Sequence, residues 1–168
     1  MESVAFTESD KATRYRELLP QLASLIADEP DLVANLANTT AALRACLPIA
    51  SWVGFYVRKG NELVLGPFQG HVACVRIALG KGVCGTAASE RRTLVVPDVD
   101  KFPGHIACDA GSRSEIVVPI LRGTIGREPD ENDVVAVLDL DSYELAAFDD
   151  VDAAGLAPIA ELLGGLQW

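Results

Sequence analysis

The chain has 168 residues, of which 49% are apolar and 23% charged, so it has the length of one domain and is too apolar for wholesale disorder. The 14 Lys and Arg against 24 Asp and Glu give a net charge of −10, which repels phosphate backbones and anionic lipid. The uncharged run at 45–57 contains Pro48 and is too short to cross a bilayer, and no secretory signal opens the chain. We therefore expect a soluble, cytoplasmic protein with no nucleic-acid and no membrane partner.

Two helices are expected in the first 48 residues. Residues 12–27 place apolar side chains at helical spacing, and residues 31–47 repeat the pattern after Asp28-Glu29-Pro30. The apolar positions are Tyr15, Leu18, Leu19, Leu22, Leu25 and Ile26 in the first segment and Leu32, Leu36, Leu43 and Leu47 in the second. Asp31 is suited to begin the second helix as its N-cap, and Pro48 to end it.

Beyond residue 48 the apolar pattern changes to that of strands. Segments 52–57 and 62–68 flank a Lys-Gly-Asn turn and predict a hairpin, and a third strand is expected at 72–79. A glycine-rich loop, a short helix and a short strand follow at 80–85, 86–91 and 93–96.

The rest of the chain is expected to close the sheet. It contains a loop at 100–112, strands at 115–121 and 134–140, a polar connection between them at 123–133, and a helix at 148–166. Helices at both ends and hairpin-linked strands between them predict an α+β fold, in which the helices pack against a central antiparallel sheet.

The loop Gly80-Lys81-Gly82-Val83-Cys84-Gly85 matches the G-x-G-x-x-G pattern of dinucleotide-binding proteins, and Asp98 lies near the place of the ribose ligand. However, the helix expected after it is short, and too little parallel-strand sequence follows for a dinucleotide fold. We therefore favour a loop whose glycines permit tight turns and close backbone approach.

Four cysteines, Cys46, Cys74, Cys84 and Cys108, lie in a chain that we expect in a reducing compartment, where static disulfides are rare. They form no C-x-x-C pair, and the two histidines do not complete a zinc-finger pattern. Zinc held by the last three cysteines and one histidine is compatible with the spacing, although nothing in the spacing indicates it.

Cys108 lies in a polar loop, where a thiol can be exposed and reactive or buried and inert. His105 and Arg113 would favour its thiolate, whereas Asp109 and Glu115 would oppose it. Both interpretations stay open on the residues alone.

The other cysteines differ in their predicted surroundings. Cys84 lies at the expected start of a helix, where the helix dipole lowers a thiol pKa, but a small residue filling a crowded turn explains it equally well. Cys74 is expected on a strand as a buried thiol, and Cys46 in the apolar stripe of the second helix.

Two further pairs share a strand face. Alternation puts Asp139 and Asp141 opposite the neighbouring leucines, and because like charges facing a core would be costly, these carboxylates are expected to face solvent or line a site. Trp52 and Tyr56 also lie on one face, where core packing or a ligand wall would explain them.

Six segments stand in a recognisable order along the chain. They are Ser51-Trp52-Val53-Gly54-Phe55-Tyr56, Gly66-Pro67-Phe68-Gln69-Gly70, Gly82-Val83-Cys84-Gly85-Thr86-Ala87, His105-Ile106-Ala107-Cys108-Asp109, Ser112-x-Ser114-Glu115-Ile116-Val117-Val118-Pro119 and Asp139-Leu140-Asp141-Ser142. This series resembles the free methionine-(R)-sulfoxide reductases, which are built on a single GAF domain. The resemblance implies one GAF domain over 1–168, with a helical part at 1–48 and the sheet, site loops and closing helix at 49–168.

The resemblance also implies roles for particular residues. Cys108 matches the catalytic cysteine, Cys84 the main resolving cysteine, and Cys74 a third thiol that can join disulfide exchange. Glu115, Asp139 and Asp141 match the carboxylates that bind substrate, and Trp52 and Tyr56 match the aromatic wall.

The implied chemistry is thiol-dependent reduction of free methionine (R)-sulfoxide, without cofactor or metal. Cys108 would attack the sulfoxide sulfur while Glu115 or one of the aspartates protonates the oxygen, leaving a cysteine sulfenic acid. Cys84 would then form a disulfide, which a thioredoxin-like dithiol reduces. The carboxylates would pair with the α-ammonium that only the free amino acid carries.

Two alternatives and one departure from the family pattern accompany this prediction. The chain could instead be a non-catalytic GAF module that binds a small ligand or senses oxidants, or a zinc protein. The connection at 123–133 is longer and more acidic than the family pattern, and Gly111 would add mobility beside Cys108. The oligomeric state stays open, with a homodimer among the alternatives.

Overall fold

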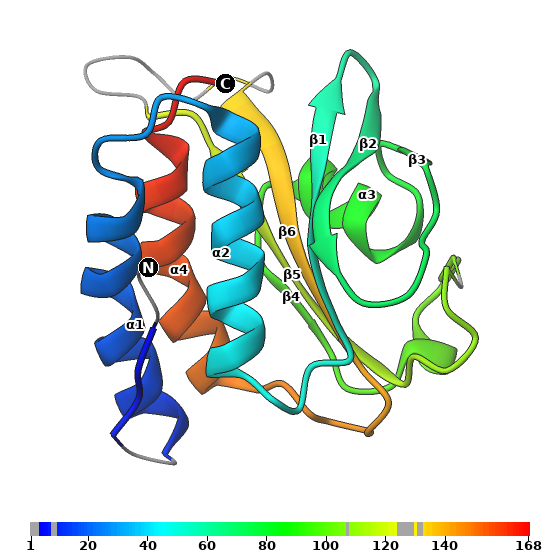
Figure 1. The fold of residues 1–168 in the computed structure, drawn as a ribbon. Coiled ribbons are helices and arrows are strands. Elements are labelled where there is room, and N and C mark those ends of the chain that lie inside the picture. Colours follow the sequence, from blue (N-terminus) through cyan, green and yellow to red (C-terminus); the bar gives the residue numbers. More distant parts are fainter. Residues whose placement is uncertain (1–3, 8–9, 107, 124–129, 131–132) are drawn as a thin grey trace.

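A computed structural model describes residues 4–7, 10–106, 108–123, 130 and 133–168. Three helices, α1 (Lys11–Ile26), α2 (Leu32–Cys46) and α4 (Asp150–Gly164), cover one face of the sheet, and α3 (Gly82–Glu90) lies on the other face (Figure 1). This arrangement confirms the predicted α+β fold. No helix in the described ranges combines the length and the hydropathy that a membrane-spanning segment needs.

The sheet has six strands in the order β3-β2-β1-β6-β5-β4, and every neighbouring pair is antiparallel. The strands are β1 (Trp52–Lys59), β2 (Glu62–Gln69), β3 (Arg76–Ala78), β4 (Leu94–Val96), β5 (Ser114–Leu121) and β6 (Val134–Ser142). In the centre of the sheet, Gly54 of β1 pairs with Asp139 of β6, and Glu115 of β5 pairs with Asp141. Because of this register, three strands from distant parts of the sequence end side by side.

Aspartates begin the long helices. Asp31 accepts a hydrogen bond from Ala34 N and caps α2 as predicted, and Asp10 does the same for α1 through Thr13 N. Asp149 forms a capping box with Asp152 at the start of α4, which therefore begins two residues after the expected position 148.

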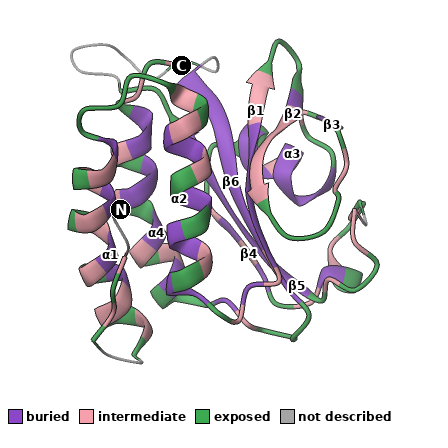
Figure 2. Ribbon diagram, viewed as in Figure 1, coloured by how far each residue is buried: buried purple, intermediate pink, exposed green. Residues whose placement is uncertain are grey.

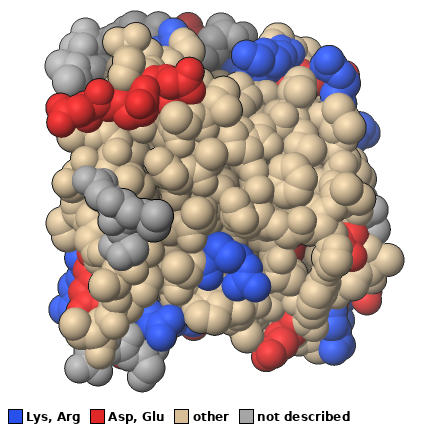
Figure 3. Space-filling view, viewed as in Figure 1, with Lys and Arg blue, Asp and Glu red and all other residues tan. Residues whose placement is uncertain are grey.

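Alternation along β6 separates two apolar clusters. Leu138 and Leu140 are fully buried against α1, α2 and α4, whereas Asp139 and Asp141 point to the face that carries α3. Figure 2 shows buried residues on the inner sides of the helices and throughout the central strands. In Figure 3, which has the same view as Figure 1, acidic residues gather in one band at the upper left, and basic residues lie apart from that band.

The strand predicted at 72–79 is wrong in its first half. β3 pairs with β2 only from Glu62 to Val64, and Val72 and Val75 are 87% and 64% exposed. The two valines therefore face solvent, whereas Ala73 and Cys74 pack partly against the apolar cluster on the α3 side of the sheet. Cys74 consequently lies in the connection between β2 and β3 and not on a strand.

The glycine-rich segment is a tight entry into α3 and not a dinucleotide loop. The helix begins at Gly82, earlier than the expected residue 86, and Gly80 and Gly82 have φ values of 75° and 59°. A Cβ at Gly85 would lie 2.3 Å from Ala78 O, so only glycine permits this approach. Of the polar connection predicted at 123–133, positions 124–129, 131 and 132 lie outside the described residues.

Candidate active site

The ends of β1, β5 and β6, the first turn of α3 and the two loops that carry Cys74 and Cys108 enclose a cavity of ≈ 40 Å³. Seven of the eight residues predicted for the site line it: Trp52, Tyr56, Cys84, Cys108, Glu115, Asp139 and Asp141. The eighth, Cys74, is joined to the cavity wall through Cys108.

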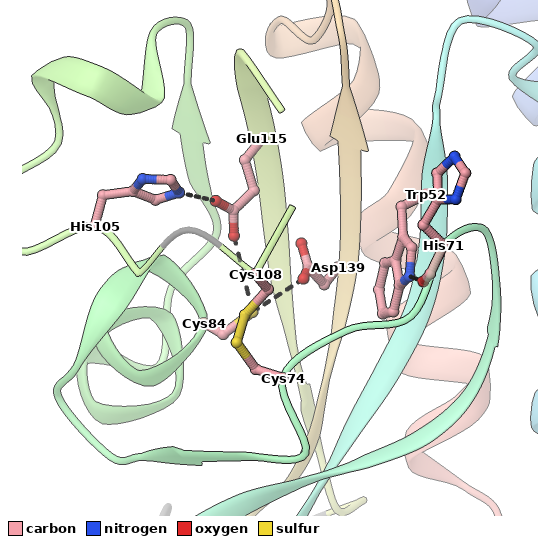
Figure 4. The surroundings of a disulfide bond; sticks show 8 residues. All are labelled: Trp52, His71, Cys74, Cys84, His105, Cys108, Glu115 and Asp139. Atoms are coloured by element: carbon pink, nitrogen blue, oxygen red, sulfur yellow. Dashed lines mark hydrogen bonds and ion pairs between the residues drawn. A yellow bond between two sulfur atoms is a disulfide. The ribbon is translucent and has the colours of Figure 1, made fainter. Parts of the chain in front are cut away.

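Cys74 and Cys108 form a disulfide across 34 positions of sequence, with an S–S distance of 2.09 Å (Figure 4). Both residues are partly exposed, so the expectation of Cys74 as a buried strand thiol is wrong. The cysteines that remain free are Cys46, fully buried in the helical core as predicted, and Cys84. The disulfide joins Cys108 to Cys74 and not to Cys84, so Cys84 as the main resolving thiol stays a prediction.

Cys84 lies between two carboxyl groups that come from neighbouring strands. Its Sγ donates a hydrogen bond to Asp139 Oδ2 at 3.2 Å and lies 3.8 Å from Glu115 Oε1 (Figure 4). Burial, and next the negative charges of Asp139 and Glu115, raise the pKa of Cys84 well above the ordinary thiol value. The expected lowering by the helix dipole is therefore wrong, because desolvation and two acidic neighbours outweigh it.

The carboxyl groups of the site are also held toward their neutral forms. Burial raises the pKa of Asp139 to about 7 and the pKa of Glu115 well above the ordinary value, and the charge of Asp139 raises the latter further. The pKa of the partly exposed Asp141 is raised by desolvation and by Asp139. The raised pKa therefore biases Glu115 toward its protonated form, and its carboxyl group lies against a thiol and an aspartate.

His105 lies beside this acid. Its Nε2 is 4.0 Å from Glu115 Oε2, and burial lowers the pKa of the imidazole. Both shifts favour the neutral forms of the two groups, which avoids a buried, uncompensated charge.

Trp52 is held on both sides in a short aromatic stack. Its ring centroid lies 6.0 Å from that of Tyr56 and 5.4 Å from that of Phe68, and its Nε1 donates to His71 O at 3.0 Å. A Cβ at Gly54 would lie 2.3 Å from the Trp52 ring, so glycine at that position makes room for the stack. Phe68 supports the site from behind Trp52 without lining the cavity, and its place in one of the six segments was the signal in the sequence that could have found it.

The loop that follows Cys108 is fastened by a residue without a sequence signal of its own. Tyr143 Oη donates to Asp109 Oδ2 at 2.8 Å, and Asp109 Oδ1 accepts from Gly111 N at 2.9 Å. These bonds link the loop beside the disulfide to the residue that follows β6, and the mobility expected from Gly111 stays a prediction.

The fold and this cavity define a GAF-domain protein, and the GAF domain family model matches residues 31–165. The chain is 43% identical over 154 residues to the free methionine-R-sulfoxide reductase of Escherichia coli, covering 92% of this chain and 88% of that protein. The corresponding enzyme of Saccharomyces cerevisiae is 42% identical over 161 residues, covering 92% and 86%. The chain therefore belongs to the free methionine-R-sulfoxide reductase family, an oxidoreductase family, as the six segments predicted.

Solved structures agree with this assignment. The free methionine-R-sulfoxide reductase of Neisseria meningitidis, solved with its substrate, superposes with a TM-score of 0.89 at 50% identity and covers 98% of this chain and 94% of its own. The reduced form of the Staphylococcus aureus enzyme gives 0.82 at 48% identity, covering 98% and 97%.

Proposed function

We propose that the protein reduces free methionine (R)-sulfoxide to methionine, with Cys108 as the nucleophile. The observation that carries this proposal is the position of Cys108, which lies on the cavity wall among Glu115, Asp139 and Asp141 and is already in a disulfide. The family relatives named for this activity support it.

The proposed reaction begins with the Cys74–Cys108 disulfide reduced. The Cys108 thiolate attacks the sulfoxide sulfur, and Glu115 donates a proton to the sulfoxide oxygen. The S–O bond of the substrate then breaks, and the protonated oxygen is transferred to the Cys108 sulfur, which becomes a sulfenic acid. The substrate sulfur gains the electron pair that the Cys108 sulfur loses, and methionine leaves. Glu115 suits the role of acid because burial raises its pKa and so favours its protonated form.

Cys74 then condenses with the sulfenic acid, which releases water and forms the disulfide. The partial exposure of both cysteines supports the recycling of this bond by a thioredoxin-like dithiol in the cytoplasm. Cys84 would enter the exchange only as a thiolate, and its raised pKa slows that step. This argument favours Cys74 over Cys84 as the first resolving thiol.

The carboxyl groups supply the proposed preference for the free amino acid. The side chains of Asp139 and Asp141 share one strand face, where a carboxylate can pair with an α-ammonium group that a peptide-bound residue lacks. The Trp52–Tyr56 wall would receive the methyl end of the substrate.

Turnover of free methionine (R)-sulfoxide with a dithiol reductant tests the proposal, beside the S epimer and a peptide-bound sulfoxide. We expect turnover of the free R form alone, abolished in Cys108→Ser and retained in Cys46→Ser, whose thiol lies in the helical core. No turnover by folded, fully reduced protein would instead favour a non-catalytic GAF module. The oligomeric state, for which we keep the homodimer as a hypothesis, is measurable by light scattering on the same samples.

A further inference from the structure

Three possible metal ligands face one another in the cavity wall, apart from the disulfide. One donor atom from each of Cys84, Glu115 and Asp139 can be chosen so that all lie within 4.8 Å of one another, and the three residues are 4–5% exposed. In a tetrahedral zinc site with Zn–S near 2.3 Å and Zn–O near 2.0 Å, a sulfur and an oxygen ligand lie about 3.5 Å apart. The distances of 3.2 and 3.8 Å from Cys84 Sγ to the two carboxyl oxygens bracket this value.

A second observation indicates an unfilled ligand position. Asp139 Oδ1 is buried and accepts no hydrogen bond from an N–H or S–H group in the described part of the chain, and the other hydrogen-bonding neighbour of the Asp139 carboxyl is the Glu115 carboxyl. A buried carboxylate oxygen without an N–H or S–H donor is costly, and a cation held by both oxygens of Asp139 would remove the cost. The oxygen belongs to a residue that lines the cavity, so an ion there can be reached from the substrate side.

The donor set selects the kind of cation. Magnesium and calcium prefer an all-oxygen shell, whereas one thiolate with two carboxylates suits a borderline-soft ion such as Zn²⁺ or Cd²⁺. Three protein ligands leave a fourth position for water or another ligand from the cavity, as in zinc sites that keep an open coordination position.

We propose that Cys84, Glu115 and Asp139 form a binding site for a thiophilic divalent cation, and that the bound ion competes with the sulfoxide substrate. On binding, the Cys84 S–H bond and any carboxyl O–H bonds break, metal–sulfur and metal–oxygen bonds form, and the protons leave to solvent. The site differs from the zinc site considered from the sequence, because Cys74 and Cys108 are not ligands. The competition rests on the proposed reductase function, whereas the binding does not.

Titration of the disulfide-bonded protein with Cd²⁺ isolates this site, because Cys46 and Cys84 are then the free thiols. We expect one Cd²⁺ per chain, with a thiolate-to-cadmium charge-transfer absorption that is retained in Cys46→Ser and lost in Cys84→Ser. Asp139→Asn and Glu115→Gln should each weaken Cd²⁺ binding by about tenfold or more. Absence of the band in wild type, or its persistence in Cys84→Ser, would overturn the proposal. Wild type and the two carboxyl variants decide the matter if Cys84→Ser does not fold.

Zinc inhibition of turnover tests the competition separately. With free Zn²⁺ set by a metal buffer, the apparent KM should rise while kcat stays constant, and chelation should reverse the effect. Equal inhibition of wild type and Asp139→Asn would assign it to the reduced Cys74 and Cys108 and overturn the competition. No turnover in metal-free protein that still binds one Cd²⁺ would remove the proposed function and leave the metal site standing.

Discussion

Replacing Asp139 by Asn should stabilise the fold above neutral pH while impairing turnover. Asp139 is only 5% exposed, and this burial raises the pKa of its carboxyl group from 3.8 to about 7. Above that pH the folded protein must carry a buried carboxylate between Cys84 and Glu115, which the neutral amide of Asn avoids.

The direction of the pH dependence follows from the raised pKa. Because the folded pKa lies above the unfolded value, the carboxyl group contributes stability that is fully present below 3.8 and is lost as pH rises through about 7. A shift of about three units corresponds to about 4 kcal/mol, which is the upper limit of the gain in the free energy of unfolding. Since the Asn amide needs hydrogen-bond partners of its own, we expect about 1–3 kcal/mol at pH 8 and almost none at pH 4.

Urea unfolding of wild type and Asp139→Asn at several pH values measures this difference, and turnover should fall about 10²-fold in the variant. Asp152→Asn is the matched control, because Asp152 is equally buried but accepts hydrogen bonds from Tyr15 Oη at 2.9 Å and Lys11 Nζ at 2.6 Å. Asn removes the negative charge that pairs with Lys11 and leaves one acceptor oxygen where the carboxylate offers two, so this variant should destabilise the fold by about 2–3 kcal/mol. A stability difference for Asp139→Asn that does not grow with pH would refute the reasoning.

Glu115→Gln keeps the shape of the proposed proton donor without its acidity, so kcat should fall about 10²–10⁴-fold, and an unchanged kcat would exclude Glu115 as the acid. Both free thiols of the disulfide-bonded protein are buried, so an alkylating reagent should label them only after unfolding; rapid labelling of the native protein would contradict their burial. Gly155→Ala should cost about 1–3 kcal/mol in unfolding free energy, because its Cβ would lie 2.3 Å from the Tyr15 ring. Gly165→Ala is the control, because its Cβ would have no neighbour closer than 3.3 Å, and its unfolding free energy should stay within about 0.5 kcal/mol of wild type. Similar costs for the two variants would show that the close approach of Gly155 to Tyr15 does not set the cost.

The local pattern of the sequence by itself determined the helices, the hairpin and the face of each strand residue. Apolar spacing predicted α1 and α2, and the Asp31 cap was confirmed at its residue. Alternation placed Asp139 and Asp141 opposite Leu138 and Leu140, because successive side chains of a strand point to opposite faces whatever the strand packs against. The six segments likewise predicted the family to which the chain belongs.

Only the tertiary structure decided the chemical state of the thiols. Cys74 meets Cys108 across 34 positions of sequence, and the connection that carries Cys74 was predicted as a strand because its exposed valines resemble a buried pattern. The pKa of Cys84 was predicted in the wrong direction because the helix start is a local feature, whereas the desolvation and the carboxyl groups that outweigh it come from β5 and β6. Ionisation depends on every charge and every solvent molecule near a group, and folding brings those neighbours together from distant parts of the chain.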